Sequence, residues 1–68
     1  MESFAKRLKQ LREEEKLSMR QLAKILGLSP SAYQFYEYGQ SEPRLEMLIK
    51  IAKHFGVTVG YLLGVEEI

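Results

Sequence analysis

Helix-capping residues and glycines occur at short intervals in this sequence, and they constrain the possible fold more than any other feature. A serine or threonine at a helix start accepts a hydrogen bond from a backbone amide, and a glycine at the end adopts the left-handed conformation that stops the helix. The predicted starts are Ser18, Ser29 and Thr58, and the predicted stops are Gly27, Gly39, Gly56 and Gly64. Ser18 and Gln21 have the spacing of a reciprocal capping box. These residues leave room only for short helices joined by tight turns.

The apolar residues between the caps recur at three- and four-residue steps, and no segment shows the alternation of a strand. We therefore predict an all-α domain of five short helices. The predicted helices span approximately residues 2–15, 18–27, 29–38, 44–56 and 58–64. The predicted buried stripe of the fourth helix holds Leu45, Leu48, Ile49, Ala52 and Phe55.

The length of 68 residues is enough for one small domain, residues 1–68. The chain has no cysteine, which excludes disulfides and thiolate zinc sites. Its apolar runs are too short for a membrane span and its first residues do not resemble a signal peptide, so we expect a cytoplasmic protein. It has no paired acid and base, nucleophile or ligand cluster, so we expect neither an enzyme nor a cofactor or small-molecule ligand.

The formal net charge is only +1, but the basic residues are unevenly distributed. Seven of the ten lysines and arginines fall in the first 24 positions, and none occurs between Ile25 and Pro43. A surface that binds anions must therefore use the first third of the chain, or else backbone amides and neutral side chains.

Residues 18–38 have the features of a helix-turn-helix unit. Gly27, Leu28 and Ser29 form a connection of about three residues between two short helices. Ala23 is small where the two helices must cross closely. The side chains predicted to face the core are Leu22, Leu26, Leu28, Tyr33 and Tyr36.

The chain resembles the phage repressor and Cro-like helix-turn-helix regulators, called the XRE family, over nearly its whole length. The similar segments are RLKQLREEEKLS (7–18), RQLAKILGLSPSAY (20–33), FYEYG (35–39), LEMLIKIAKHFGV (45–57) and YLLG (61–64). The resemblance implies a lambda-repressor-like DNA-binding domain, whose third helix enters the major groove of double-stranded DNA. It also implies a transcriptional regulator, which we expect to be a repressor that binds a pseudo-palindromic operator as a dimer.

One face of the third helix is the candidate surface for reading bases. With Tyr33 facing inward and 100° of rotation per residue, the opposite face holds Ser31, Gln34, Phe35 and Tyr38. Glutamine can pair with adenine, serine can donate or accept, and an exposed phenylalanine can contact a thymine methyl group. The alternative for the two aromatic residues is partial shielding by the following loop or by a dimer neighbour.

Phosphate contacts are expected from helix amide ends and nearby cations. The candidates are Arg20, Lys24, Ser29 and Arg44. Met19 stands where relatives commonly have glutamine, and Gln40 and Ser41 stand where they tend to have a basic pair. Pro30, at a position that often reads bases, has no polar group. We therefore expect a shallow salt dependence and a modest affinity.

Two other polar residues receive structural interpretations. The resemblance implies that Glu37 forms a structural ion pair with Arg12 of the first helix. His54, the only histidine, lies opposite Leu45 on its helix and is expected to face solvent, so no metal site is predicted.

The C-terminal end of the chain is rich in apolar residues. We expect a homodimer through this region, with Tyr61, Leu62, Leu63, Val65 and Ile68 at the interface. The alternative is that Leu62 and Leu63 simply close the core. A second hypothesis for the function is a protein-interaction module, antitoxin-like or an adaptor, because the basic residues missing from positions 40 and 41 weaken DNA binding.

Overall fold

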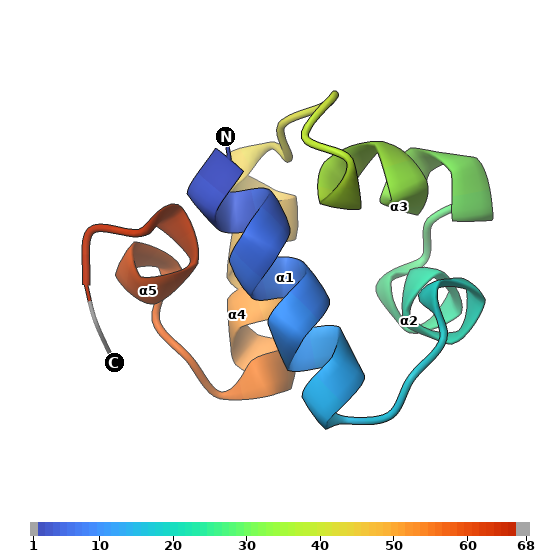
Figure 1. Cartoon of the computed structure of the whole chain (residues 1–68), viewed down its shortest axis with the longest axis horizontal. Helices are drawn as coiled ribbons and strands as arrows, with labels where there is room; N and C mark the ends of the chain where they lie inside the picture. The colour runs from blue at the N-terminus through green and yellow to red at the C-terminus, as the bar shows by residue number, and fades with distance from the viewer. Residues whose placement is uncertain (1, 67–68) are drawn as a thin grey trace.

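The computed structural model describes residues 2–66, which form five α-helices and no strands. The helices are α1 (Glu2–Glu14), α2 (Met19–Leu26), α3 (Pro30–Glu37), α4 (Leu45–Phe55) and α5 (Val59–Leu63). In Figure 1, α2 and α3 lie at one end of the molecule, α5 lies at the other end, and α1 crosses in front of α4 between them. The predicted all-α class with five short helices is confirmed.

Local hydrogen bonds set the ends of the helices. Ser18 Oγ accepts from the Gln21 amide at 3.0 Å, and Gln21 Oε1 accepts from the Ser18 amide at 2.8 Å, which completes the capping box. Ser29 and Thr58 cap α3 and α5, each accepting from the amide three residues later. Gly27 ends α2 with φ of 76°, a left-handed conformation that costs glycine little.

All five helices contribute to the core. Its buried members are Phe4, Leu8, Leu22, Ala23, Leu26, Tyr33, Leu48, Ile51, Ala52 and Leu62. Because α1 packs against both α3 and α5, it connects the two ends of the molecule. None of the helices within residues 2–66 is long and apolar enough to cross a membrane.

The predicted buried stripe of α4 is wrong at two positions. Leu45 is 68% exposed and Ile49 is 39% exposed, whereas Ile51 is fully buried. The apolar residues of α4 span an arc wider than the surface that its neighbours cover. The core takes the side of the arc that holds Leu48, Ile51 and Ala52, and Leu45 and Ile49 are left at the edge.

The predicted C-terminal dimer surface also needs correction. Leu62 is fully buried in the monomer, so it closes the core and cannot lie at an interface. Tyr61 and Leu63 are partly buried, and Val65 is 77% exposed. Ile68 lies outside the described residues.

Arg7, for which no role is predicted from the sequence, links α1 to the C-terminal end of the chain. Its guanidinium lies 4.4 Å from the centre of the Tyr61 ring and donates to the carbonyl oxygens of Tyr61 and Glu66. Thr58 donates a further hydrogen bond to the Glu66 carboxylate at 2.6 Å. These contacts hold the short helix α5 against α1.

Candidate nucleic-acid interface

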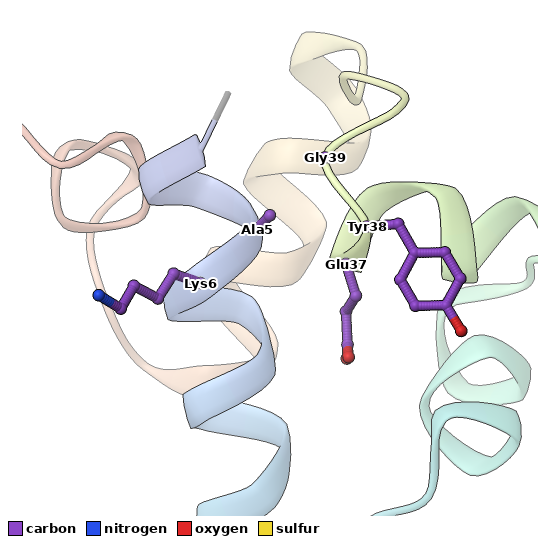
Figure 2. A pocket seen from close by; sticks show the side chains of 5 residues that line it. All are labelled: Ala5, Lys6, Glu37, Tyr38 and Gly39. Carbon is purple, nitrogen blue, oxygen red and sulfur yellow. The ribbon is translucent and has the colours of Figure 1, made fainter.

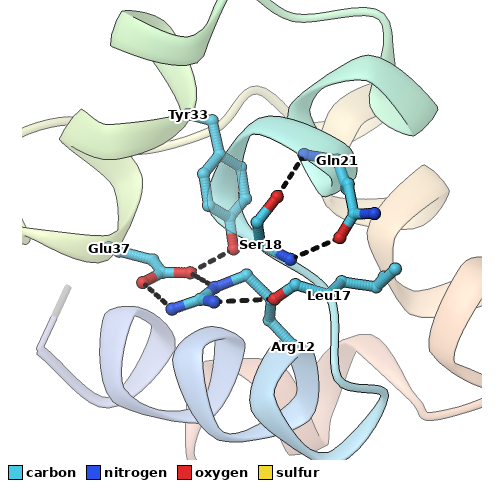
Figure 3. A network of polar contacts seen from close by, with 6 residues as sticks. All are labelled: Arg12, Leu17, Ser18, Gln21, Tyr33 and Glu37. Atoms are coloured by element: carbon cyan, nitrogen blue, oxygen red, sulfur yellow. Dashed lines mark hydrogen bonds and ion pairs between the residues drawn. The ribbon is translucent and has the colours of Figure 1, made fainter.

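A buried polar network holds α3 against α1 (Figure 3). Glu37, at the end of α3, accepts two hydrogen bonds from the Arg12 guanidinium, at 2.6 and 3.1 Å, and one from the Tyr33 hydroxyl. Arg12 also donates to the Leu17 carbonyl oxygen at 2.8 Å, in the turn before α2. The side chains of Arg12 and Glu37 are only 12% and 3% exposed. The Arg12 guanidinium and the Glu37 carboxylate together therefore join α1, the turn after it and α3.

Burial and hydrogen bonding change the acid–base behaviour of this network. Burial, followed by the hydrogen bond to Glu37, raises the pKa of the Tyr33 hydroxyl well above its ordinary value of about 10. The hydrogen bond to Glu37 also raises the pKa of the Arg12 guanidinium. Both donors stay protonated at neutral pH, so the network acts as a support and not as a proton-transfer site.

A second polar contact supports the turn between α2 and α3. Lys50 of α4 donates from Nζ to the Leu26 carbonyl oxygen at 2.9 Å. The last carbonyls of a helix have no intrahelical donor, so a lysine there satisfies one of them and complements the helix dipole. No local pattern predicts this contact, because 24 residues separate its partners.

The outer face of α3 carries the four residues predicted to read bases. Ser31 is exposed, Phe35 is 48% exposed and Tyr38 is 61% exposed, while Gln34 is half-buried. Tyr33 is fully buried on the opposite side of the helix, where it meets Glu37. The helix therefore presents an amide, two hydroxyls and a phenyl ring together on one surface.

The starts of α2 and α3 leave backbone amides without an acceptor among the described residues. In α3, Ser29 Oγ accepts from the amide three residues later and Pro30 has no N–H, which leaves the Ser31 amide. In α2 the capping box leaves the amides of Met19 and Arg20 without an acceptor among the described residues. Open amides at a helix start favour anions such as phosphate.

The predicted phosphate-binding cations lie on the elements that flank α3. Arg20 and Lys24 on α2 are exposed, and so is Arg44 just before α4. Arg44 occupies the N-cap position but makes no capping hydrogen bond with its side chain. Met19 is partly buried against the core, so its side chain takes the role of a packing residue.

A surface hollow of about 370 Å³ lies between α1 and the end of α3. Its lining residues are Ala5, Lys6, Glu37, Tyr38 and Gly39. Figure 2 shows Lys6 and Tyr38 extending to opposite sides, away from the space between the helices. Ligand sites usually have several polar groups that converge on the ligand. These five lining residues lack that arrangement, so the hollow has no built cofactor site.

His54 is exposed, but it has a partner. Its Nε2 lies 3.0 Å from Glu15 Oε1, which links the ends of α4 and α1. No group of three or more potential metal ligands occurs within the part of the chain that the structure describes.

Comparisons with known proteins bear on this surface. A family model described as helix-turn-helix matches residues 8–62. The uncharacterized HTH-type transcriptional regulator YobD of Bacillus subtilis is 39% identical over 94% of this chain and 57% of its own length. The cryptic phage CTXphi transcriptional repressor RstR of Vibrio cholerae is 33% identical over 94% of this chain and 58% of its own length. The HTH-type transcriptional activator BcrR of Enterococcus faecalis is 40% identical over 96% of this chain and 32% of its own length.

The family match contains the whole of α2 and α3 together with Arg12 and Glu37. The chain spans a little over half the length of YobD and of RstR. No solved structure is significantly similar to it.

Proposed function

Because the chain belongs to the helix-turn-helix family of DNA-binding transcriptional regulators, we propose that it represses transcription by occupying a pseudo-palindromic operator as a homodimer. In each copy α3 lies in the major groove, with its outer face toward the base edges. The observation that carries this proposal is the shared outward position of Ser31, Gln34, Phe35 and Tyr38.

Each residue of this face suits a different group on DNA. The Gln34 amide can both donate to and accept from adenine, and the Ser31 hydroxyl can serve several base edges. Phe35, with half of its surface exposed, provides an apolar contact for a thymine methyl group. Gln34 is half-buried, so its side chain loses less conformational entropy on binding than a fully exposed glutamine.

Phosphates are held by helix amides and by flanking cations. The Ser29 hydroxyl oxygen accepts from its own helix, so its hydrogen can donate to a phosphate oxygen. The cations are Arg20, Lys24 and Arg44. Three released counterions per copy give a slope of log affinity against log salt of about −5 for a dimer.

Repression is the simplest outcome of this binding, since occupancy of a promoter needs no surface beyond the DNA interface. Among the relatives, RstR is named a repressor and BcrR an activator. A promoter reporter carrying the selected operator tests the direction. We expect lower expression when the chain is produced, and higher expression overturns the repressor assignment.

The central experiment measures fluorescence anisotropy with duplexes selected from a random pool. We expect the selected duplexes to bind about 10³-fold more tightly than random DNA at physiological salt. Gln34→Ala is expected to relax the base preference at one position of the site without abolishing binding. The absence of any sequence preference at low salt would overturn the proposal.

One observation favours a second candidate, a protein-interaction module on the same fold. Residues 25–43, which include α3 and the loop after it, contain no lysine or arginine. Co-purification of a stoichiometric protein partner, together with no gel shift of any selected duplex, supports this candidate over the first.

A further inference from the structure

The outer face of α4 has a pattern that DNA recognition does not use. Leu45 and Ile49 are 68% and 39% exposed, and they lie one helical turn apart. Lys53 lies one turn further along the same row, and Glu46 lies beside this row. All four residues are exposed. We call this surface the α4 strip: Leu45, Glu46, Ile49 and Lys53.

The two charges of the α4 strip have no ion-pair partner among the described residues. A lysine four residues after a glutamate is its ordinary partner on a helix. Lys50 holds that position relative to Glu46, but it donates to the Leu26 carbonyl oxygen instead. No described residue forms an ion pair with Glu46 or with Lys53. Along the helix, the strip therefore has a carboxylate toward one end and an ammonium at the other, with Ile49 between them and Leu45 beside the carboxylate.

We propose that two copies of this chain associate through the α4 strip, with their α4 helices antiparallel about a two-fold axis near Ile49. Glu46 is three residues before Ile49 and Lys53 is four residues after it. At a rise of 1.5 Å per residue they lie about 4.5 and about 6 Å from Ile49 along the helix axis. The near-equal spacing places Glu46 of each copy beside Lys53 of the other, whereas parallel helices would place like charges together.

A second copy of the chain suits this strip because one helix face carries both the acid and the base that would pair across the contact. A two-fold interface uses the same patch twice, so an acid and a base on opposite sides of the axis pair with each other. An acidic or a basic partner of another kind would match only one end. The row of Leu45, Ile49 and Lys53 is also a ridge of the type that packs into the groove of a facing helix.

The size of the strip predicts a weak dimer. The 11 residues of α4 make a helix of about 16 Å, so the contact is small. We expect a dissociation constant on the order of 10–100 μM in the absence of DNA. This assignment rests on the proposed function for the homodimer that binds the operator, and it replaces a C-terminal interface in which Leu62 is buried.

Sedimentation equilibrium of the whole chain without DNA tests the assignment, over protein concentrations from about 1 μM to about 1 mM. Wild type is expected to change from monomer to dimer within this range. Ile49→Lys is expected to weaken the dimer at least about tenfold by bringing two ammonium groups to the axis. Val65→Lys is the matched control, because Val65 is exposed outside the strip, and it is expected to leave the dimer unchanged. Leu45→Lys, at a more exposed position, repeats the test if Ile49→Lys lowers the stability of the fold.

Charge exchange tests the antiparallel arrangement itself. Glu46→Lys is expected to weaken the dimer, and adding Lys53→Glu is expected to restore it, because the exchanged charges pair again. A monomer at every concentration, a dimer insensitive to Ile49→Lys, or a charge exchange that fails to restore association would overturn the assignment.

DNA-binding measurements distinguish a failure of this assignment from a failure of the proposed function. Ile49→Lys is expected to bind a single half-site like wild type and to bind the full operator more weakly. If wild type has no sequence preference but still dimerises as described, the proposed function fails and the α4 strip assignment stands. If wild type binds its operator selectively and Ile49→Lys binds the full operator equally well, the assignment fails and the proposed function stands.

Discussion

The outer faces of α3 and α4 both expose large apolar side chains, but the polar groups beside those side chains differ in kind. On α3, Phe35 lies next to the neutral Ser31 and Gln34. On α4, Leu45 and Ile49 lie among formal charges. Neutral amides and hydroxyls match the donors and acceptors on base edges, whereas opposite charges around an apolar centre match a protein surface. The polar neighbours, more than the apolar area, indicate which ligand an exposed patch suits.

The two faces are also supported in different ways. Behind α3 lies the hydrogen-bonded network of Arg12, Tyr33 and Glu37. Behind α4 lies apolar packing, which includes Ile51. The core beneath α4 also contains Tyr33, whose hydroxyl belongs to the network behind α3. A change in the network is therefore expected to disturb both faces, and a change on either surface only one.

Glu37→Ala is expected to have the largest effect. It leaves the Tyr33 hydroxyl without its acceptor and the Arg12 guanidinium with only the Leu17 carbonyl oxygen, which costs about 3 kcal/mol of unfolding free energy. Urea denaturation measures the loss, and both DNA binding and self-association should decline with it. Glu14→Ala, at an exposed position on α1, is the control and should change stability by less than about 0.5 kcal/mol. A similar loss in both variants would mean that the network does not support the two faces.

Alkaline pH is expected to weaken the support behind α3. The pKa of Tyr33 is raised in the folded chain by burial, so the unfolded chain releases this proton first as the pH rises above about 10. The contribution of Tyr33 is complete below that pH and falls by about 1.4 kcal/mol by pH 11. Unfolding free energies at pH 9 and pH 11 measure the slope. Tyr33→Phe should reduce it, whereas Tyr38→Phe on the exposed face should not.

Phe35→Ala is expected to show that the α3 face contacts thymine methyl groups and that the α4 face does not. Replacing a contacted thymine by uracil removes one methyl group and should weaken wild-type binding about fourfold. Anisotropy titrations should show that Phe35→Ala has lost this sensitivity, while Leu45→Ala on α4 retains it. Equal sensitivity in wild type and Phe35→Ala would contradict the methyl contact.

Arg44→Ala is expected to have the smallest effect. It should weaken binding to all sequences alike and make the salt slope of a dimer shallower by about 2. Titrations of selected and random duplexes at several salt concentrations measure both quantities. Lys9→Ala, exposed on α1, is the matched cation control. A loss of affinity confined to the selected duplex would instead assign Arg44 to base reading.

Local residues were sufficient to predict much of this molecule. The start and end of α2 and the start of α3 follow from Ser18, Gly27 and Ser29, because capping bonds reach only three or four residues. The inward side of α3 follows from Tyr33 and helical rotation, and the outward quartet follows from the same rotation. The pairing of Arg12 with Glu37 came from the family resemblance, since 25 residues separate the two.

The sequence by itself determined the helices and the sides of α3, because capping and helical rotation act between near neighbours in the chain. Only the tertiary structure decided that Leu62 is covered and that Leu45 and Ile49 are not. It also decided that Lys50 donates to the Leu26 carbonyl oxygen instead of pairing with Glu46. The apolar arc of α4 is wider than the area that its neighbours cover, so the position of those neighbours selects which of its edges faces water.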